Sequence, residues 1–285
     1  MRIVDAQVHI WSKTVVPTFG LHRKVTAFTA DQLLREMDEA GVDAALIHPP
    51  ASWDPDSNAL AVAAASSYPD RFAVMGQFPL DAPESRKLIR GWRNQPGMMG
   101  LRWPLLSETH QKWLHDGALE WLWPAAAQEG LPIAMMGGLF LSKFRDIAER
   151  HPDLKMILDH CGLDRHGRDA QAFVHLDELV ALAQVPNVAV KATGAPHYST
   201  QEYPFRNIQD GLHRIFDAFG PKRMFWGTDI TRMPCSYRQC VTFFTDELHW
   251  LSGRDLEDVM GRGLCEWIGW DHQLRGGSRA AEARR

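Results

Sequence analysis

The sequence is poor in cysteine and in long apolar runs, and each shortage excludes a class of protein. Four cysteines occur among 285 residues, and none belongs to a Cys-x-x-Cys pair. A disulfide scaffold, a zinc ribbon and a thioredoxin-like redox centre are therefore excluded. No apolar run approaches the roughly 20 residues of a membrane span. The first residues lack the basic and apolar segments of a signal peptide, so we expect a cytoplasmic protein with no membrane partner.

A strong excess of charge is also missing. The formal net charge is −4, and 23% of the residues are charged, so nothing indicates nucleic acid as a partner. The apolar fraction of 45% is ordinary for a soluble globular protein. No linker rich in Pro, Gly or Ser divides the chain. We therefore predict one domain over residues 1–272 and a flexible basic tail over residues 273–285.

Short apolar segments alternate with helical segments eight times along the chain. Strands are expected at residues 2–5, 42–48, 71–78, 98–103, 131–136, 154–160, 187–193 and 223–229. Helices are expected from a capping box at Thr29 to a stop at Gly41, and at residues 58–68, 83–93, 117–129, 141–150, 170–183, 204–219, 236–251 and 256–268. Strands that are apolar on both faces predict a closed (β/α)₈ barrel with an extra C-terminal helix. A doubly wound sheet is the alternative, but no G-x-G-x-x-G follows the first strand.

Polar residues at the expected strand ends predict the position of an active site, because barrel enzymes place their sites at the C-terminal ends of the strands. Asp5, Gln7 and His9 alternate along the first strand and should share one face. The other strand ends offer His48, Gln77, Arg102, Asp159, His160, Lys191, Thr228 and Asp229. Asp159 and Cys161 flank His160, so we expect both side chains to point towards the helices and to be structural. The long segment over residues 12–28 is expected to be functional.

These residues carry a resemblance to a known family. His9, the pair Asp159-His160 and the run Gly227-Thr228-Asp229 resemble the amidohydrolase superfamily. With Gly100-Leu101-Arg102 and residues 5–11, they are most similar to its amidohydrolase-related branch. That branch includes sugar lactonases, 2-pyrone-4,6-dicarboxylate lactonase and metal-dependent decarboxylases. The resemblance covers about residues 3–270 and implies a barrel enzyme.

Two departures from the pattern of that family concern metal binding. Gln7 stands where the family has a His or Glu, and Met135 and Met136 occupy the region of a fifth-strand ligand. A binuclear metal site is therefore not expected, because an amide is a weak ligand for zinc-type ions. The remaining set, His9, His160 and Asp229, could hold one divalent ion such as zinc or manganese. It could equally work without a cofactor, as the resemblance to the pyrone lactonase implies.

The predicted reaction is hydrolysis of a small carboxylated lactone or related cyclic ester. Asp229 is the candidate general base, with burial expected to raise its pKa. His9 and His160 would polarise the carbonyl, as imidazolium groups or through a metal, and Gln7 would add an amide donor. The alternatives are a metal-dependent decarboxylase of an aromatic or enol acid, and a non-catalytic binding barrel.

The predicted partner is a small anionic substrate. Arg102 would grip a carboxylate through its fork, with Trp11 and Trp103 as apolar walls. The further candidates for substrate binding are His48, Lys191, Arg165 and Arg232, although solvated rim charges are the favoured interpretation of Arg165 and Arg232. Tryptophans at positions 92, 113, 121 and 123 hint at a helix face that packs against a second copy of the chain.

Overall fold

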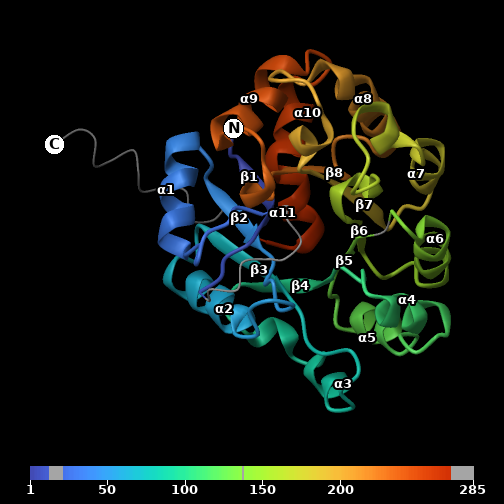
Figure 1. The fold of residues 1–285 in the computed structure, drawn as a ribbon. Helices are drawn as coiled ribbons and strands as arrows, with labels where there is room; N and C mark the ends of the chain where they lie inside the picture. The colour runs from blue at the N-terminus through green and yellow to red at the C-terminus, as the bar shows by residue number, and fades with distance from the viewer. Residues whose placement is uncertain (13–21, 137, 271–285) are drawn as a thin grey trace.

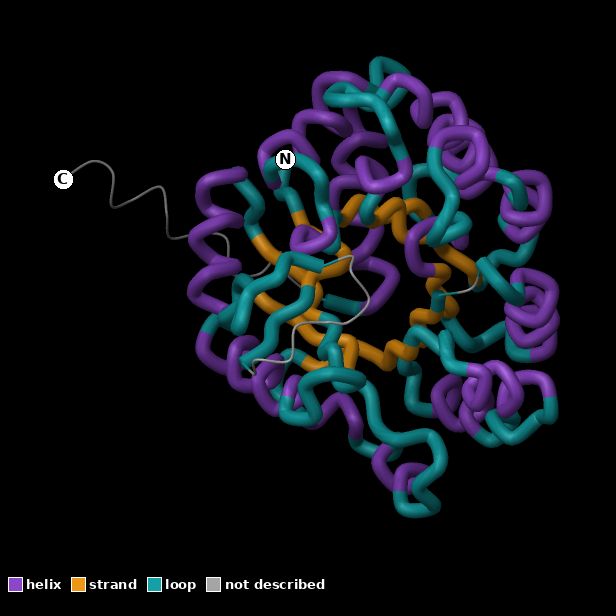
Figure 2. The backbone as a smooth tube through the Cα atoms, viewed as in Figure 1, coloured by secondary structure: helices purple, strands orange, loops and turns teal. Residues whose placement is uncertain are grey.

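The computed structural model describes residues 1–12, 22–136 and 138–270, with one eight-stranded parallel sheet at the centre (Figure 1). The strands are β1 (Val4–Val8), β2 (Ala44–Ile47), β3 (Phe72–Gly76), β4 (Met98–Trp103), β5 (Ile133–Met135), β6 (Met156–Leu158), β7 (Val188–Thr193) and β8 (Met224–Gly227). Each strand is hydrogen-bonded to the next one along the chain. Figure 2 shows the strands as a ring with helices around it. The predicted (β/α)₈ barrel is confirmed.

One or more helices follow each strand of the ring. They are α1 (Ala30–Ala40), α2 (Ser57–Ser67), α3 (Ser85–Leu88), α4 (Glu108–His115), α5 (Leu122–Gln128), α6 (Leu141–Arg150), α7 (Leu176–Leu182), α8 (Gln209–Phe219), α9 (Tyr237–Thr242), α10 (Gly253–Glu257) and α11 (Gly263–Ile268). The capping box of Thr29 and Gln32 begins α1, and Gly41 ends it in the left-handed conformation. The expected extra C-terminal helix is α11.

The connection between β4 and β5 differs from the expectation. It holds two helices, of which α4 was not predicted, and the expected helix over residues 117–129 is reduced to α5. Gly117 has a φ of +78° between them, a backbone conformation that interrupts a right-handed helix. The expected helix over residues 83–93 is likewise shortened to the four residues of α3.

The barrel closes where β8 returns to β1. The backbone N–H of Asp229 donates to the carbonyl of Gln7 over 2.8 Å. A Cβ at Gly227 would lie 2.5 Å from the methyl group of Thr193 and 2.9 Å from the backbone nitrogen of Ala6. Since real Cβ atoms do not approach so closely, the last strand needs a glycine at this point.

The core has two layers, one inside the ring and one between the ring and the helices. Alternate strand residues such as Ala6, Leu46 and Phe225 fill the inside. Leu264 and Ile268 of α11 pack against this inner layer, at the end where the chain begins. The inside of the barrel is therefore a packed core, and the opposite end carries the polar residues.

The tryptophans proposed for a contact between copies lie largely in or against this core. Trp92 and Trp123 are buried, and Trp113 and Trp121 pack against the outer layer. Self-association therefore stays a prediction. Within the described ranges, no helix combines the length and the apolar character that crossing a membrane requires. The predicted tail lies outside the described residues, as does most of the long segment after β1.

Candidate active site

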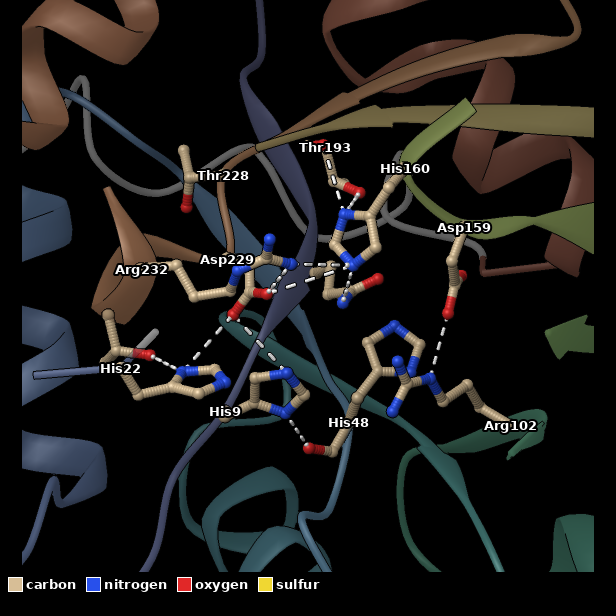
Figure 3. A network of polar contacts seen from close by, with 12 residues as sticks. His9, His22, His48, Arg102, Asp159, His160, Thr193, Thr228, Asp229 and Arg232 are labelled. Atoms are coloured by element: carbon tan, nitrogen blue, oxygen red, sulfur yellow. Dashed lines mark hydrogen bonds and ion pairs between the residues drawn. The ribbon is translucent and has the colours of Figure 1, made fainter. Parts of the chain in front are cut away.

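Side chains from strands that are far apart in sequence converge on one carboxylate at the C-terminal end of the barrel (Figure 3). Nε2 of His9 lies 3.4 Å from Oδ1 of Asp229, and Nε2 of His160 lies 3.9 Å from Oδ2. All three residues are at least 96% buried. The predicted meeting of two imidazoles and one carboxylate is therefore present.

Hydrogen bonds fix both imidazole rings from behind. Nδ1 of His9 lies 2.5 Å from the carbonyl of His48, and Nδ1 of His160 lies 3.1 Å from the carbonyl of Thr193. A carbonyl accepts a hydrogen bond, so each Nδ1 carries the proton. Each Nε2 therefore presents a lone pair towards Asp229.

The backbone turns sharply at two of these residues. His160 and Asp229 both have a φ of +53°, which is uncommon for residues other than glycine and costs about 1–3 kcal/mol each. The strands end just before them, at Leu158 and Gly227. The turn directs both side chains into the mouth of the barrel. Such strain is typical of functional sites.

The expectation that Asp5, Gln7 and His9 share one face is wrong. The pairing of β1 with β2 shifts register between Asp5 and Val8, and such an irregularity breaks the alternation of side chains. Asp5 points outward, where its carboxylate accepts hydrogen bonds from the hydroxyl of Tyr237 and the backbone N–H of Thr228, over 2.7 and 2.9 Å. Burial raises the pKa of Asp5 to about 6. Gln7 points inward instead.

The prediction that Asp159 points towards the helices is also wrong. Strand β6 ends at Leu158, and Asp159 continues the inward face of Ile157. Its carboxylate accepts hydrogen bonds from Nε of Arg102 and Nζ of Lys191, over 2.9 and 2.8 Å. His160 can also reach the mouth because the backbone turns there. Asp159 thus joins two predicted site residues in a buried network.

Lys191 connects this network to β1 and β2. Its ammonium lies 3.0 Å from Nε2 of His48 and donates to Oε1 of Gln7 over 3.4 Å. Nε2 of Gln7 lies 3.3 Å from Nε2 of His160. Burial lowers the pKa of Lys191 to about 8, against the opposing effect of Asp159. The amide of Gln7 therefore links the lysine to the His–Asp–His group.

The charge states differ from those expected from burial alone. Burial favours protonation of Asp229, but His9, His22, Arg232 and His160 outweigh it and hold its pKa well below the usual range. Burial lowers the pKa of His9 to about 4. Burial and the nearby Arg232 lower the pKa of His160 to about 3. At neutral pH the site therefore holds an ionised carboxylate between neutral imidazoles, and the proposed imidazolium donors are not present.

These lowered histidine pKa values predict a loss of stability in weak acid. In the unfolded chain a histidine titrates near 6.5, so between pH 6.5 and 4 the unfolded state binds more protons than the folded one. The free energy of unfolding should therefore fall as the pH falls through this window, by on the order of 3 kcal/mol per histidine. Urea unfolding at several pH values measures this slope.

A matched pair of variants tests the origin of that slope. His9→Gln should flatten it, whereas His115→Gln, at an exposed residue of α4, should leave it as in the wild type. An unchanged slope in His9→Gln would contradict the assignment.

The residues do not fit a metal ion in this arrangement. Their chemistry is that of a zinc ligand set, but no group of three His, Cys, Asp or Glu side chains in the described part of the chain has the geometry to hold an ion. Nη1 of Arg232 lies 3.3 Å from both Nε2 of His160 and Oδ2 of Asp229. A guanidinium therefore already supplies the positive charge between these two groups.

The remaining predicted substrate contacts differ in their burial and in their distance from the centre of the site. Arg232 is buried at the centre of the site, so its interpretation as a solvated rim charge is wrong. Arg165 is half-buried near it. Trp103 packs edge-on against Phe78, and its indole N–H donates to the Phe78 carbonyl; its role as an apolar wall stays a prediction.

Two aromatic residues near the carboxylate were not predicted. Nδ1 of His22 lies 4.0 Å from Oδ1 of Asp229, and Trp53 contacts the rings of both His9 and His22. Trp11 reaches the site through Trp53, at 6.2 Å between ring centroids. The unusual length of the segment over residues 12–28 was the signal for His22, and no local pattern singled out Trp53.

Cys161 is buried, and burial raises the pKa of its thiol far above the usual range. A thiol in that state is not a nucleophile. This agrees with the structural role expected for it.

A closed (β/α)₈ barrel with a buried His–Asp–His group at the C-terminal ends of its strands carries its polar residues where the class of barrel enzymes places its active sites. Within that class, the sequence profile of the amidohydrolases matches residues 4–271. The chain belongs to the amidohydrolase family, whose members are hydrolases or decarboxylases. No curated protein matches the sequence directly.

Solved structures of similar fold include both kinds of enzyme. An amidohydrolase from Burkholderia multivorans with bound zinc is 19% identical, with 94% of this chain and 99% of that chain covered and a TM-score of 0.81. A probable 2-pyrone-4,6-dicarboxylic acid hydrolase from Acinetobacter baumannii, with citric acid bound, is 16% identical, with 95% and 100% covered and a TM-score of 0.72. A 5-carboxyvanillate decarboxylase from Sphingomonas paucimobilis is 17% identical, with 94% and 99% covered and a TM-score of 0.65. At these identities the likeness extends to the fold alone.

Proposed function

We propose that this amidohydrolase is a hydrolase that opens a small carboxylated lactone or related cyclic ester by attack of water. The observation that carries the proposal is the ionised carboxylate of Asp229 between two imidazole lone pairs. Oδ1 of Asp229 is buried, and it has no hydrogen-bond partner within the described part of the chain. It lies 3.4 Å from Nε2 of His9, which carries the lone pair. Two acceptors that face one another without a proton between them favour a bound water molecule, which can donate to both.

The reaction then proceeds by transfer of one proton of that water to Asp229 while its oxygen bonds to the ester carbonyl carbon. His9 accepts a hydrogen bond from the second O–H of the water, which stays on the oxygen, and so orients the water; its neutral form is the useful one. The carbonyl oxygen gains negative charge, which the guanidinium of Arg232 and the neighbouring Lys191 stabilise. When the ester C–O bond breaks, the proton held by Asp229 passes to the leaving alkoxide.

The low pKa of Asp229 affects both of its proposed proton transfers, from the water and to the leaving group. A carboxylate held ionised by its neighbours is a weak base, and it returns the proton readily to the leaving group. A substrate that draws Arg232 towards its own charge would weaken the hold on Asp229 and raise the basicity of the carboxylate. Arg102 stays a candidate substrate contact, although its Nε is committed to Asp159.

The proposal is tested by screening lactones for acid release and aromatic acids for carbon dioxide release, with metal analysis of the same preparation. Turnover of lactones supports the proposal. Decarboxylation that depends on a stoichiometric divalent metal would replace it with the second candidate, which the decarboxylases of similar fold motivate. Tight binding without turnover in either assay would favour a non-catalytic barrel.

A further inference from the structure

One side of the mouth carries buried polar atoms that have no hydrogen-bond partner among the described residues. They are Nε and Nη2 of Arg232, Nε of Arg165, the hydroxyl of Tyr198 and Nε2 of His197. These residues follow β6, β7 and β8, which are neighbours in the sheet. The side chain of Arg232 is 5% exposed and Tyr198 is 1% exposed. A buried donor without a partner costs about 1–3 kcal/mol, so such a cluster indicates a ligand that supplies acceptors.

The free atoms of Arg232 form one edge of its guanidinium. Nη1 is used at the centre of the site, 3.3 Å from both His160 and Asp229. Nε and Nη2 have no hydrogen-bond partner among the described residues. These two N–H groups form the parallel pair that binds both oxygens of a carboxylate. Their geometry matches a planar group with two oxygens.

The electrostatics of the cluster favour an anion. Burial lowers the pKa of Arg165, and the proximity of Arg232 lowers it further, as expected for two cations with no anion between them. Among the described residues, Arg232 has one carboxylate partner, Asp229, and Arg165 has none. Burial raises the pKa of Tyr198 to about 12, against the opposing effect of the Arg232 guanidinium near its oxygen. The hydroxyl therefore stays protonated, and its O–H can donate to a ligand. Arg102, by contrast, already has Asp159 as a counterion.

We propose that Arg232, Arg165 and Tyr198 form a carboxylate-binding subsite of the active site. This subsite rests on the proposed function in one respect: its ligand is the carboxylate of the proposed substrate. One guanidinium separates it from Asp229, so the bound carboxylate lies close to the reacting carbonyl. The substrates are therefore esters or lactones with a carboxylate within a few bonds of the carbonyl carbon. Arg165 and Tyr198 become specificity-determining residues.

Equilibrium binding of small probes tests the subsite without any turnover. Malonate is the probe, and malonamide is its uncharged counterpart of similar shape. Titration calorimetry and thermal unfolding should show that malonate binds and stabilises the wild type, whereas malonamide does not. Inorganic phosphate, a bulkier and more highly charged anion, should bind more weakly because Asp229 lies beside the subsite.

Variants assign the binding to these residues. Tyr198→Phe and Arg165→Met should each weaken malonate binding about tenfold, since a charge-assisted hydrogen bond is lost. Two variants are the matched controls. Tyr203→Phe removes a hydroxyl that is hydrogen-bonded to Thr242, and Arg145→Met removes an exposed guanidinium that is paired with Glu149. Both should bind malonate as the wild type does. Unchanged unfolding temperatures of the unliganded variants would show that the fold is intact.

Several outcomes would overturn the subsite. Equal binding of malonate and malonamide, or no stabilisation by any anion, would mean that the donors hold water. If malonate binding is lost in Arg102→Met but retained in Tyr198→Phe, the anion binds at Arg102 and not at the proposed subsite. Tighter binding of phosphate than of malonate would replace the carboxylate with a phosphoryl group. Failure of the proposed reaction would leave these binding results unchanged, so the two proposals fail separately.

Discussion

Asp229→Asn should lower kcat by about 10²–10⁴-fold on the lactone identified by the screen, the range attributed to a positioned general base. The amide keeps the shape of the carboxylate and still accepts from Arg232, but its oxygen cannot take a proton from water at neutral pH. KM should change much less, because the side chain acts on the water and not on the substrate. Steady-state kinetics of the purified variant measure both quantities.

The control for this variant is another buried carboxylate paired with an arginine. Asp258 is 2% exposed and bonds the guanidinium of Arg262, at the end of the barrel opposite the mouth. Asp258→Asn should lose some stability and keep wild-type kcat. Wild-type kcat in Asp229→Asn would remove this residue as the base, and an equal loss in both variants would point to a fold defect.

The sequence predicted the fold well because the signals for a barrel are local. Runs of apolar residues the length of a strand, separated by helix caps such as Thr29 and Gly41, are readable without tertiary information. The residues at the strand ends were found for the same reason, since a barrel brings all of those ends together. His9, His160 and Asp229 therefore meet as expected.

The errors arose where one residue changes the direction of the backbone. The register shift after Asp5 and the positive φ of His160 both reverse the alternation on which side-chain directions were predicted. The pattern of apolar and polar residues along the sequence does not reveal either change in backbone direction. Burial of Arg232 was missed because it depends on neighbouring loops, and burial alone gave the wrong direction for the pKa of Asp229 because four nearby groups outweigh it.

The corrected position of Asp159 leads to a large predicted effect on stability. Its carboxylate is the counterion of two buried cations, Arg102 and Lys191. Asp159→Ala leaves both charges in the barrel without an anion, and breaking a buried pair in this way costs about 3–5 kcal/mol. Chemical unfolding at neutral pH should show this loss, provided that unfolding is two-state.

The double variant Asp159→Ala/Lys191→Met distinguishes charge from packing. Removing Lys191 after Asp159 leaves one uncompensated cation in place of two, so the double variant should be more stable than Asp159→Ala alone. A packing defect would instead make the double variant less stable, because a second buried side chain has been changed.

Asp258→Ala is the comparison for loss of a carboxylate whose partner is accessible: the side chain of Arg262 is 24% exposed and can be solvated. It should cost about 1 kcal/mol, well below Asp159→Ala. If the two single variants lose the same stability, burial of the cations is not what makes Asp159 necessary.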